Sequence, residues 1–460
     1  MPTISRQNLR FRPSLSFALL CIFLTILWLA GGASKPEAMG QVVVRLAALM
    51  VLIAITLFGD RPVLNQGKPV AYILSAGVVL ALLQLVPLPP AIWQALPGRS
   101  LFVQAAALSG QPQPWRPWAI VPGMATNAAI SLVVPVTVLI LLAGLREDEQ
   151  LWLPGIALLL IAASTIVGLL QFSGSTFENP FINDSVGQVS STFANRNHFA
   201  LFVAFGCLLA PAWAFDEVKK LSWRIPISLS LILLFVLTII ATGSRGGLAA
   251  GFISLGISAL LTYRNFKDKL RLYPKRIVFI IIGLIVAVAI ILVLLSISSN
   301  RALSIDRLFI ANAEQDMRRR ALPTVWAMIW TYFPAGSGLG GFNNIFRIHE
   351  PFALLKPTYF NHAHNDFLEI ILDTGLAGGA LLVIALTWWV YASMRVWRAG
   401  RGVRTTHARV GSAILLLVIF ASAFDYPART PMIMAMITLA AFWLSKGSDA
   451  PRPPALPTAD

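Results

Sequence analysis

Apolar runs of membrane-spanning length alternate with short polar turns along almost the whole chain. A helix needs about 20 apolar residues to cross a bilayer, and runs near that length recur from one end of the sequence to the other. The runs cover 14–30, 42–58, 70–86, 127–145, 152–172, 199–215, 225–263, 277–295, 367–394, 410–424 and 432–444. This pattern predicts an all-α membrane protein.

The run 225–263 is too long for a single span. At about 1.5 Å per residue, a helix of that length would reach roughly 58 Å, about twice the thickness of the hydrocarbon layer. The polar stretch Thr242-Gly243-Ser244-Arg245 lies near its middle, so we expect the chain to turn at Arg245. With two spans here, the predicted total is about 12 transmembrane helices.

Two longer segments are too polar to cross the bilayer. The first, 87–126, is rich in proline and tryptophan, and tryptophan prefers the membrane interface. The second, 298–361, lies between predicted spans 9 and 10 and contains an amphipathic pattern over 317–330. We expect this loop to hold amphipathic helices that lie on the membrane surface. The glycine-rich stretch 336–342 that follows either covers a lipid-linked substrate or simply connects two elements.

Composition and charge agree with this class of protein. Hydrophobic residues make up 57% of the chain, charged residues only 12%, and the mean hydropathy is +0.74, which excludes an ordinary soluble globule. A net charge of +16 would suggest a nucleic-acid partner in a soluble protein. Here the lysines and arginines lie between apolar runs, where they orient spans and contact anionic membrane lipids, so no nucleic-acid partner is expected.

The distribution of Lys and Arg predicts the topology. With the amino terminus inside, the cytoplasmic segments hold 22 of the 36 positive residues and the short outer segments hold seven. The remaining seven lie in 298–361, a segment long enough to fall outside the rule. We therefore expect both termini in the cytoplasm. Arg196, Arg245, Arg429 and the pair His362 and His364 then all lie on the outer face.

The stretch 362–379 places a polar cluster at the start of a long apolar run. Asn365 can cap a helix, and Gly375 and Gly379 have the spacing at which a neighbouring helix can approach closely. Three carboxylates recur at helical spacing and therefore share one face of this helix. They are Asp366, Glu369 and Asp373.

His362 and His364 precede this helix at the water end of a span. Acids nearby can fix the tautomer of an imidazole and raise its basicity, which would suit a general base. The same residues could instead form a polar cap on an ordinary span. They could also bind a metal ion with Asp366, Glu369 or His349, although a third ligand at a defined spacing is missing.

The spacing of His364-Asn365, nine residues, Gly375, two residues and Gly378-Gly379 resembles the H-[N/S/Q]-x9-G-x-x-G signature of the O-antigen ligase family. The resemblance extends over about 225–380. It implies a bacterial inner-membrane glycosyltransferase that uses no metal or cofactor. The implied donor is an undecaprenyl-diphosphate-linked glycan, and the implied acceptor is lipid A-core or another glycan at the periplasmic face.

Arginines at two outer turns are the candidate diphosphate ligands. Arg196 and Arg245 each stand where a polar turn meets a span, and an arginine presents a planar fork that matches phosphate oxygens. The resemblance implies the same role. Alternatively, either arginine could merely anchor a helix end at the interface.

His364 is the candidate catalytic base, which would deprotonate an acceptor hydroxyl that displaces the diphosphate with inversion. Residues that could support it are His362, Asn365, Glu369, Asp425 and Arg429. Asp425 and Arg429 lie in one outer turn, where an ordinary interhelical ion pair would explain them equally well.

Three regions follow from these patterns: amino-terminal spans in 1–224, a ligase-like core in 225–380, and carboxyl-terminal spans with a proline-rich tail in 381–460. Within the family, the complete histidine signature favours a ligase over an O-antigen or exopolysaccharide polymerase. Composition alone would also fit a 12-span secondary transporter. That alternative is disfavoured because the long loop does not divide the chain into halves and the polar groups gather at one face.

Overall fold

The computed structural model describes residues 12–449 apart from 61, 63–66, 175–178, 183–187, 216–222, 271–312, 356–359 and 401. The described residues are mostly helical, with one pair of two-residue strands, which confirms the predicted all-α class. The long helices are α1 (Leu15–Ala30), α2 (Met39–Phe58), α3 (Lys68–Leu83), α9 (Leu153–Phe172), α10 (Arg196–Phe215), α11 (Arg224–Thr242), α12 (Arg245–Leu270), α17 (Asp366–Arg398), α18 (Val403–Ser422) and α19 (Pro431–Ser448).

Eight helical segments of the described chain are long and apolar enough to cross a membrane, and α1 and α3 are shorter apolar helices. The predicted total of 12 spans stays a prediction, because the ninth, 277–295, lies outside the described residues.

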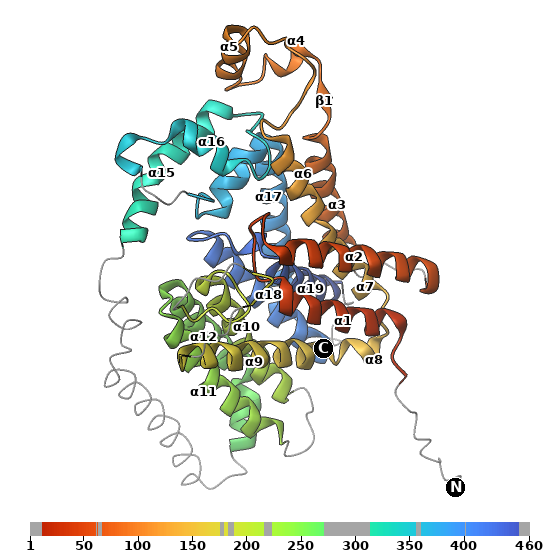
Figure 1. The fold of residues 1–460 in the computed structure, drawn as a ribbon. Helices are drawn as coiled ribbons and strands as arrows, with labels where there is room; N and C mark the ends of the chain where they lie inside the picture. The colour runs from red at the N-terminus through yellow and green to blue at the C-terminus, as the bar shows by residue number, and fades with distance from the viewer. Residues whose placement is uncertain are drawn as a thin grey trace, which may run out of the picture.

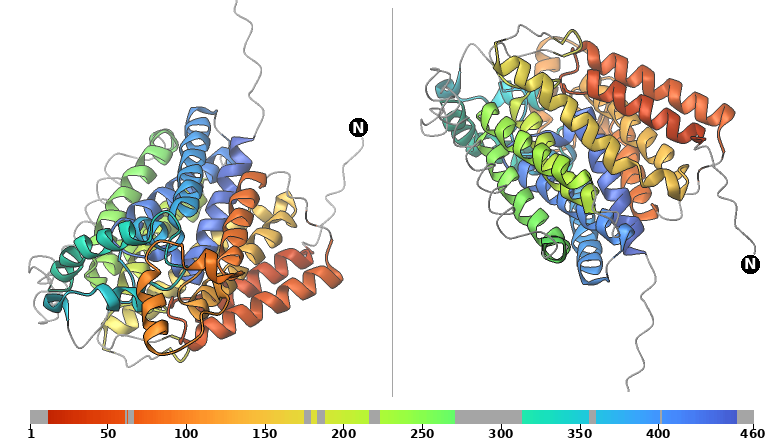
Figure 2. Two further views of the ribbon diagram at one scale, coloured as in Figure 1. Left: turned by 90° about the horizontal axis from the view of Figure 1, so that it is seen from above. Right: turned by 90° about the horizontal axis from the view of Figure 1, so that it is seen from below.

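Helix α10 lies at the centre of the helical body. In the apolar stretch of this helix 89% of the residues are buried, among them Phe199, Phe202 and Phe205. Helices α9, α11 and α12 pack around it. Helices α17, α18 and α19 lie between this group and a second group formed by α2, α3, α6 (Pro122–Ser131) and α7 (Val133–Ala143) (Figure 1 and Figure 2).

The predicted turn at Arg245 is confirmed. Helix α11 ends at Thr242 and α12 begins at Arg245, with Gly243 between them in the left-handed region at φ 60°. A side chain disfavours that conformation, so glycine suits the position. The Ser244 hydroxyl accepts the backbone N–H of Gly247 at 2.9 Å and satisfies one free donor of the new helix.

The predicted span 127–145 is two shorter helices, α6 and α7, which meet at Leu132. Pro135 explains the break, because a proline has no N–H to bond the carbonyl four residues earlier and its ring crowds that carbonyl. The helical segment also begins earlier than predicted, at Pro122, since proline suits the first turn of a helix.

Helix α17 is interrupted at Gly375, whose backbone angles are φ 58° and ψ −140°. The interpretation of Gly375 and Gly379 as a close helix-packing step is therefore wrong. A Cβ on Gly375 would lie 1.9 Å from the carbonyl oxygen of Pro334, and a Cβ on Gly379 would meet only Ile371 of the same helix. Gly375 instead lets the chain break and receive a loop.

The loop that meets this break is the glycine-rich turn 334–341. The backbone N–H groups of Ser337 and Gly338 donate to the carbonyl oxygens of Leu372 and Asp373 at 2.9 and 2.8 Å. In return, Leu376 donates to Pro334 at 2.9 Å. The turn thus satisfies backbone groups that the break leaves without helical partners.

The proline- and tryptophan-rich segment folds onto the same turn. Strands β1 (Pro87–Leu88) and β2 (Arg116–Pro117) pair antiparallel and carry α4 (Pro90–Trp93) and α5 (Ser100–Leu108) between them. The buried Arg99 guanidinium donates to the carbonyls of Trp118 and Gly336 at 2.9 and 3.2 Å. This segment stands beside α15 (Ala313–Tyr332) and α16 (Phe342–His349) at one end of the molecule (Figure 1). Helix α15 covers the predicted amphipathic pattern.

Candidate active site

The loop 361–365 delivers both histidines to the start of α17. The Asn365 side chain accepts the N–H of Leu368 at 3.0 Å, which confirms the predicted cap. His364 adopts φ 51°, a left-handed conformation that is uncommon for any residue other than glycine. Surrounding contacts must hold it there.

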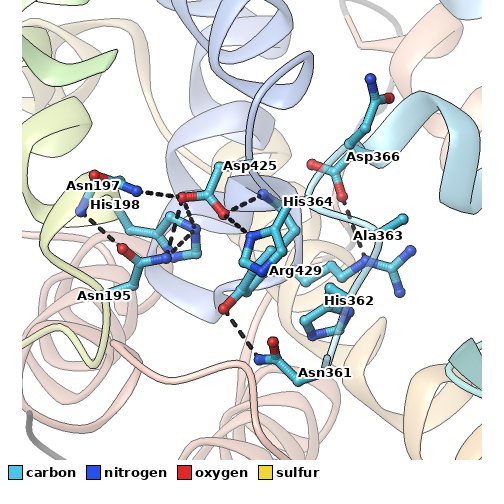
Figure 3. Close-up of polar contacts among 12 residues, drawn as sticks. Asn195, Asn197, His198, Asn361, His362, Ala363, His364, Asp366, Asp425 and Arg429 are labelled. Atoms are coloured by element: carbon cyan, nitrogen blue, oxygen red, sulfur yellow. Dashed lines mark hydrogen bonds and ion pairs between the residues drawn. The ribbon is translucent and has the colours of Figure 1, made fainter. Parts of the chain in front are cut away.

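Asp425 is the main contact of His364. It lies in the turn between α18 and α19, and its Oδ1 is 3.1 Å from His364 Nδ1. Its Oδ2 accepts the side-chain amides of Asn195 and Asn197 at 3.2 and 2.8 Å. Figure 3 shows the carboxylate between the imidazole and the two asparagines. Burial raises the pKa of Asp425, but the hydrogen bond from His364 and the charges nearby outweigh it, so the pKa lies below its usual range.

These contacts fix the tautomer of His364. An ionised carboxylate only accepts hydrogen bonds, so Nδ1 carries the proton and Nε2 keeps its lone pair. Burial lowers the pKa of His364, although the hydrogen bond with Asp425 and its charge oppose that shift. The imidazole is therefore neutral at neutral pH, which suits a group that must take up a proton.

His362 faces a different carboxylate. Its Nδ1 lies 2.8 Å from Glu369 Oε1, and Glu369 Oε2 accepts the N–H of Ala363 at 2.7 Å. Arg429 bonds the three carboxylates that share one face of α17, as the spacing predicted. The contacts are to Asp366 at 3.4 Å, Glu369 at 3.2 Å and Asp373 at 3.7 Å. Burial opposes the charge of Arg429, but these carboxylates raise its pKa above the usual value.

Asp425 and Arg429 thus have separate partners: Asp425 bonds His364, whereas Arg429 forms an interhelical ion pair with carboxylates of α17, of the kind considered above. His349, the third possible metal ligand, faces the hydroxyl of Tyr332 at 3.0 Å. Within the part of the chain that the structure describes, no three His, Cys, Asp or Glu side chains are grouped to hold a metal ion.

Arg196 and Arg245 begin helices α10 and α12, and each adjoins a residue of the Asp425 network. Asn197 bonds Asp425, and the Ser244 hydroxyl donates to Asn197 at 2.8 Å. The turns that carry the two arginines are therefore hydrogen-bonded to each other and to Asp425, which in turn bonds His364. Both side chains are partly exposed.

Sequence reasoning missed several neighbours of the histidines. Tyr426 places its ring 4.1 Å from that of His362 and 5.1 Å from that of His364, and it also contacts His198 at 5.0 Å. The run Asn195-Arg196-Asn197-His198 before a span was a usable signal, since it is unusually polar for such a position. Arg318 on α15 was also missed, and its positive charge contributes to the lowered pKa of His364.

Comparison with known families gives one match. The family model described as O-Antigen ligase matches residues 229–383, a segment that includes Arg245, the histidine loop and the break at Gly375. No curated protein matches the chain. The resemblance predicted from the histidine motif is thereby confirmed, and the chain is a multi-pass membrane protein whose residues 229–383 match the O-Antigen ligase family.

Proposed function

We propose that the protein transfers a glycan from an undecaprenyl-diphosphate carrier to an acceptor hydroxyl at the periplasmic face of the inner membrane. As an O-antigen ligase it would use lipid A-core as the acceptor. The observation that carries the proposal is the partly buried His364–Asp425 pair, which leaves His364 Nε2 as a neutral base. It lies in the segment that matches the family model.

The proposed reaction is a single displacement. His364 Nε2 takes the proton of the acceptor hydroxyl, whose oxygen forms a bond to the anomeric carbon of the donor glycan. The bond from that carbon to the diphosphate oxygen breaks, and the configuration inverts. The resulting imidazolium is stabilised by Asp425, in the way that a carboxylate supports a histidine base in other transfer enzymes.

The leaving diphosphate gains negative charge as its bond to the sugar breaks. Arg196 and Arg245 are the proposed ligands, because guanidinium groups bond phosphate oxygens in a bidentate manner and stay protonated. Arg318 supplies a further positive charge near the base. Cations arranged in this way stabilise the transition state electrostatically and make a metal ion unnecessary.

Replacement of the base tests the proposal. We expect His364→Ala to lower transfer from a purified polyprenyl-diphosphate donor by about a thousandfold or more, the usual contribution of a general base. Binding of the donor should stay near that of the parent protein, because the base acts on the acceptor. Loss of donor binding in a folded His364→Ala protein, or transfer that persists, would contradict the assignment.

A deletion strain distinguishes the ligase from its alternatives. Long glycan chains that accumulate on the carrier indicate a ligase, whereas single repeat units indicate a polymerase. Normal glycan assembly together with loss of uptake or export of a solute would instead indicate a transporter.

A further inference from the structure

A cavity of about 370 Å³ lies on the His362 side of the histidine loop. Helices α2, α3, α6, α17 and α19 surround it, and the turns that carry His362, Leu339 and Arg429 close one end. Among the described residues, none of its lining comes from α10, α11 or α12. The cavity is therefore separate from the turns that carry Arg196 and Arg245.

The cavity is elongated along α17. One stripe of that helix, at intervals of about four residues from Asp366 through Gly378 to Ala385, lines its length. At about 1.5 Å per residue this stripe extends roughly 28 Å, close to the thickness of the hydrocarbon layer. The opposite wall is α3, with Gly77 and Leu80. The shape and the apolar walls suit one extended hydrocarbon chain.

The outer end of the cavity is cationic. Arg45 on α2 donates from Nη2 to Gln41 Oε1 at 3.0 Å and to Asn127 Oδ1 at 2.7 Å, both neutral acceptors. Its Nε is buried and has no hydrogen-bond partner among the described residues. Lys35 lines the same end, together with the exposed Glu37.

Arg45 and Arg429 differ in whether a carboxylate serves as their counter-ion. Arg429 contacts three carboxylates, so it has little capacity left for an anionic ligand. Arg45 has no carboxylate partner in the described residues, although it lies within an apolar helix. An arginine in that setting is costly unless polar groups or an anion bond it, and the groups that bond Arg45 are two side-chain amide oxygens and the backbone carbonyl of Asn127, all neutral. A bound phosphate group would provide that anion.

We infer that this cavity binds a lipid with a phosphate-bearing head group, its chain along α17 and its phosphate at Arg45. The inference rests on the proposed function and assigns this lipid as the acceptor. Its head group would lie beside His362, two residues from the base, while the donor diphosphate lies at Arg196 and Arg245. Two sources carry this chemistry, a polyprenyl phosphate and an acylated glycolipid phosphate.

Native mass spectrometry of the purified full-length protein counts the lipids bound to each molecule. The probes are polyprenyl monophosphate, monophosphoryl lipid A and, as the uncharged control, polyprenol. Arg45→Gln removes the charge but keeps an amide donor, and Gly77→Leu fills the cavity. Gly256→Leu is the matched control, because a Cβ at this exposed position of α12 meets nothing within 4 Å.

We expect Arg45→Gln and Gly77→Leu each to weaken binding of one phosphate lipid by at least about tenfold, whereas Gly256→Leu matches the parent protein. Arg245→Lys should retain this lipid, since Arg245 lies outside the cavity. If the lost lipid is monophosphoryl lipid A, the occupant is an acylated glycolipid, as a ligase requires. If it is polyprenyl monophosphate, the occupant is a second carrier, as a polymerase requires.

Three results would overturn the inference: no phosphate lipid bound by the parent protein, equal binding of polyprenol, or parental binding in both cavity variants. These measurements involve no transfer reaction. If His364→Ala retained transfer while the binding pattern held, the proposed mechanism would fail and the lipid site would stand. If His364→Ala lost transfer but both cavity variants bound lipid normally, only the present inference would fail.

Discussion

His364 and His362 stand two residues apart and each bonds a buried carboxylate through Nδ1, but the groups around the two carboxylates differ. Asp425 is surrounded by the neutral amides of Asn195 and Asn197. Glu369 belongs to a cluster of three carboxylates around Arg429. Neutral donors orient a carboxylate without supplying a competing counter-ion, so the imidazolium formed at His364 would be met by Asp425. The charge of Glu369 is already met by Arg429.

The comparison teaches that a histidine with a carboxylate partner is not by itself a catalytic unit. The two histidines differ in the carboxylate available to a protonated imidazole: Asp425 has neutral asparagines as its other partners, whereas Glu369 already pairs with Arg429. On this argument His364 is the base, and His362 positions the loop and lines the cavity. Substitutions at Asp425 and His362 test this distinction, and a substitution at Arg245 tests the proposed diphosphate contact beside them.

The largest effect should come from Asp425→Asn. The amide can no longer hold His364 in one tautomer or stabilise the imidazolium, so we expect a loss of transfer of about a few hundredfold. Asp148→Asn, at an exposed carboxylate of α8 (Glu147–Gln150), is the matched control.

The pH profile of the Asp425→Asn protein should also move. Transfer requires neutral His364 and therefore rises with pH through the pKa of this imidazole. Asp425 raises that pKa, so its removal should shift the acidic limb to lower pH while the maximal rate falls. A limb that stays in place would show that the carboxylate does not act through His364.

Arg245→Lys should have the next largest effect. Lysine keeps the charge but loses the planar fork, so stabilisation of the diphosphate as it leaves should weaken by about 2.7 kcal/mol, on the order of a hundredfold in rate. The control is Arg398→Lys, at the exposed last residue of α17, away from the histidine loop. Transfer within about threefold of the parent protein, at matched expression and thermal unfolding, would remove Arg245 from the site.

The smallest effect should come from His362→Gln. A glutamine amide can still donate to Glu369, so the loop keeps its anchor and we expect transfer to fall by less than about tenfold, under 1.4 kcal/mol. Rates and thermal unfolding should be measured beside those of His364→Ala. If His362→Gln matched the loss of His364→Ala, the two histidines would share the chemistry and the comparison would fail.

Local chemistry allowed much of the fold to be predicted. The apolar runs, the turn at Arg245 and the cap by Asn365 each depend on residues close together in the sequence. The alignment of Asp366, Glu369 and Asp373 on one face follows from helical spacing alone. The break at Leu132 was missed because apolar content does not change there, although Pro135 marked it.

The contacts across the site could not be predicted in the same way. The pairing of His364 with Asp425 joins positions 61 residues apart, and it depends on how the turns before α17 and between α18 and α19 meet. The role of Gly375 was misjudged for a similar reason, since its left-handed conformation is set by the loop at Pro334. Helical spacing describes neighbours within one helix and cannot predict a contact with a distant loop.

The break at Gly375 separates two mechanical tasks within one helix. Residues 366–374 carry the acidic groups of the site and are bonded to the glycine-rich turn 334–341 through the carbonyl groups of Leu372 and Asp373. The remainder of α17 is bonded to α18, because the indole N–H groups of Trp389 and Trp397 both donate to Ser412. Membrane helices tilt when bilayer thickness changes, and a continuous rod would transmit that tilt to the histidine loop. The break at Gly375 would let the rest of the helix change its tilt while residues 366–374 stay bonded to the glycine-rich turn.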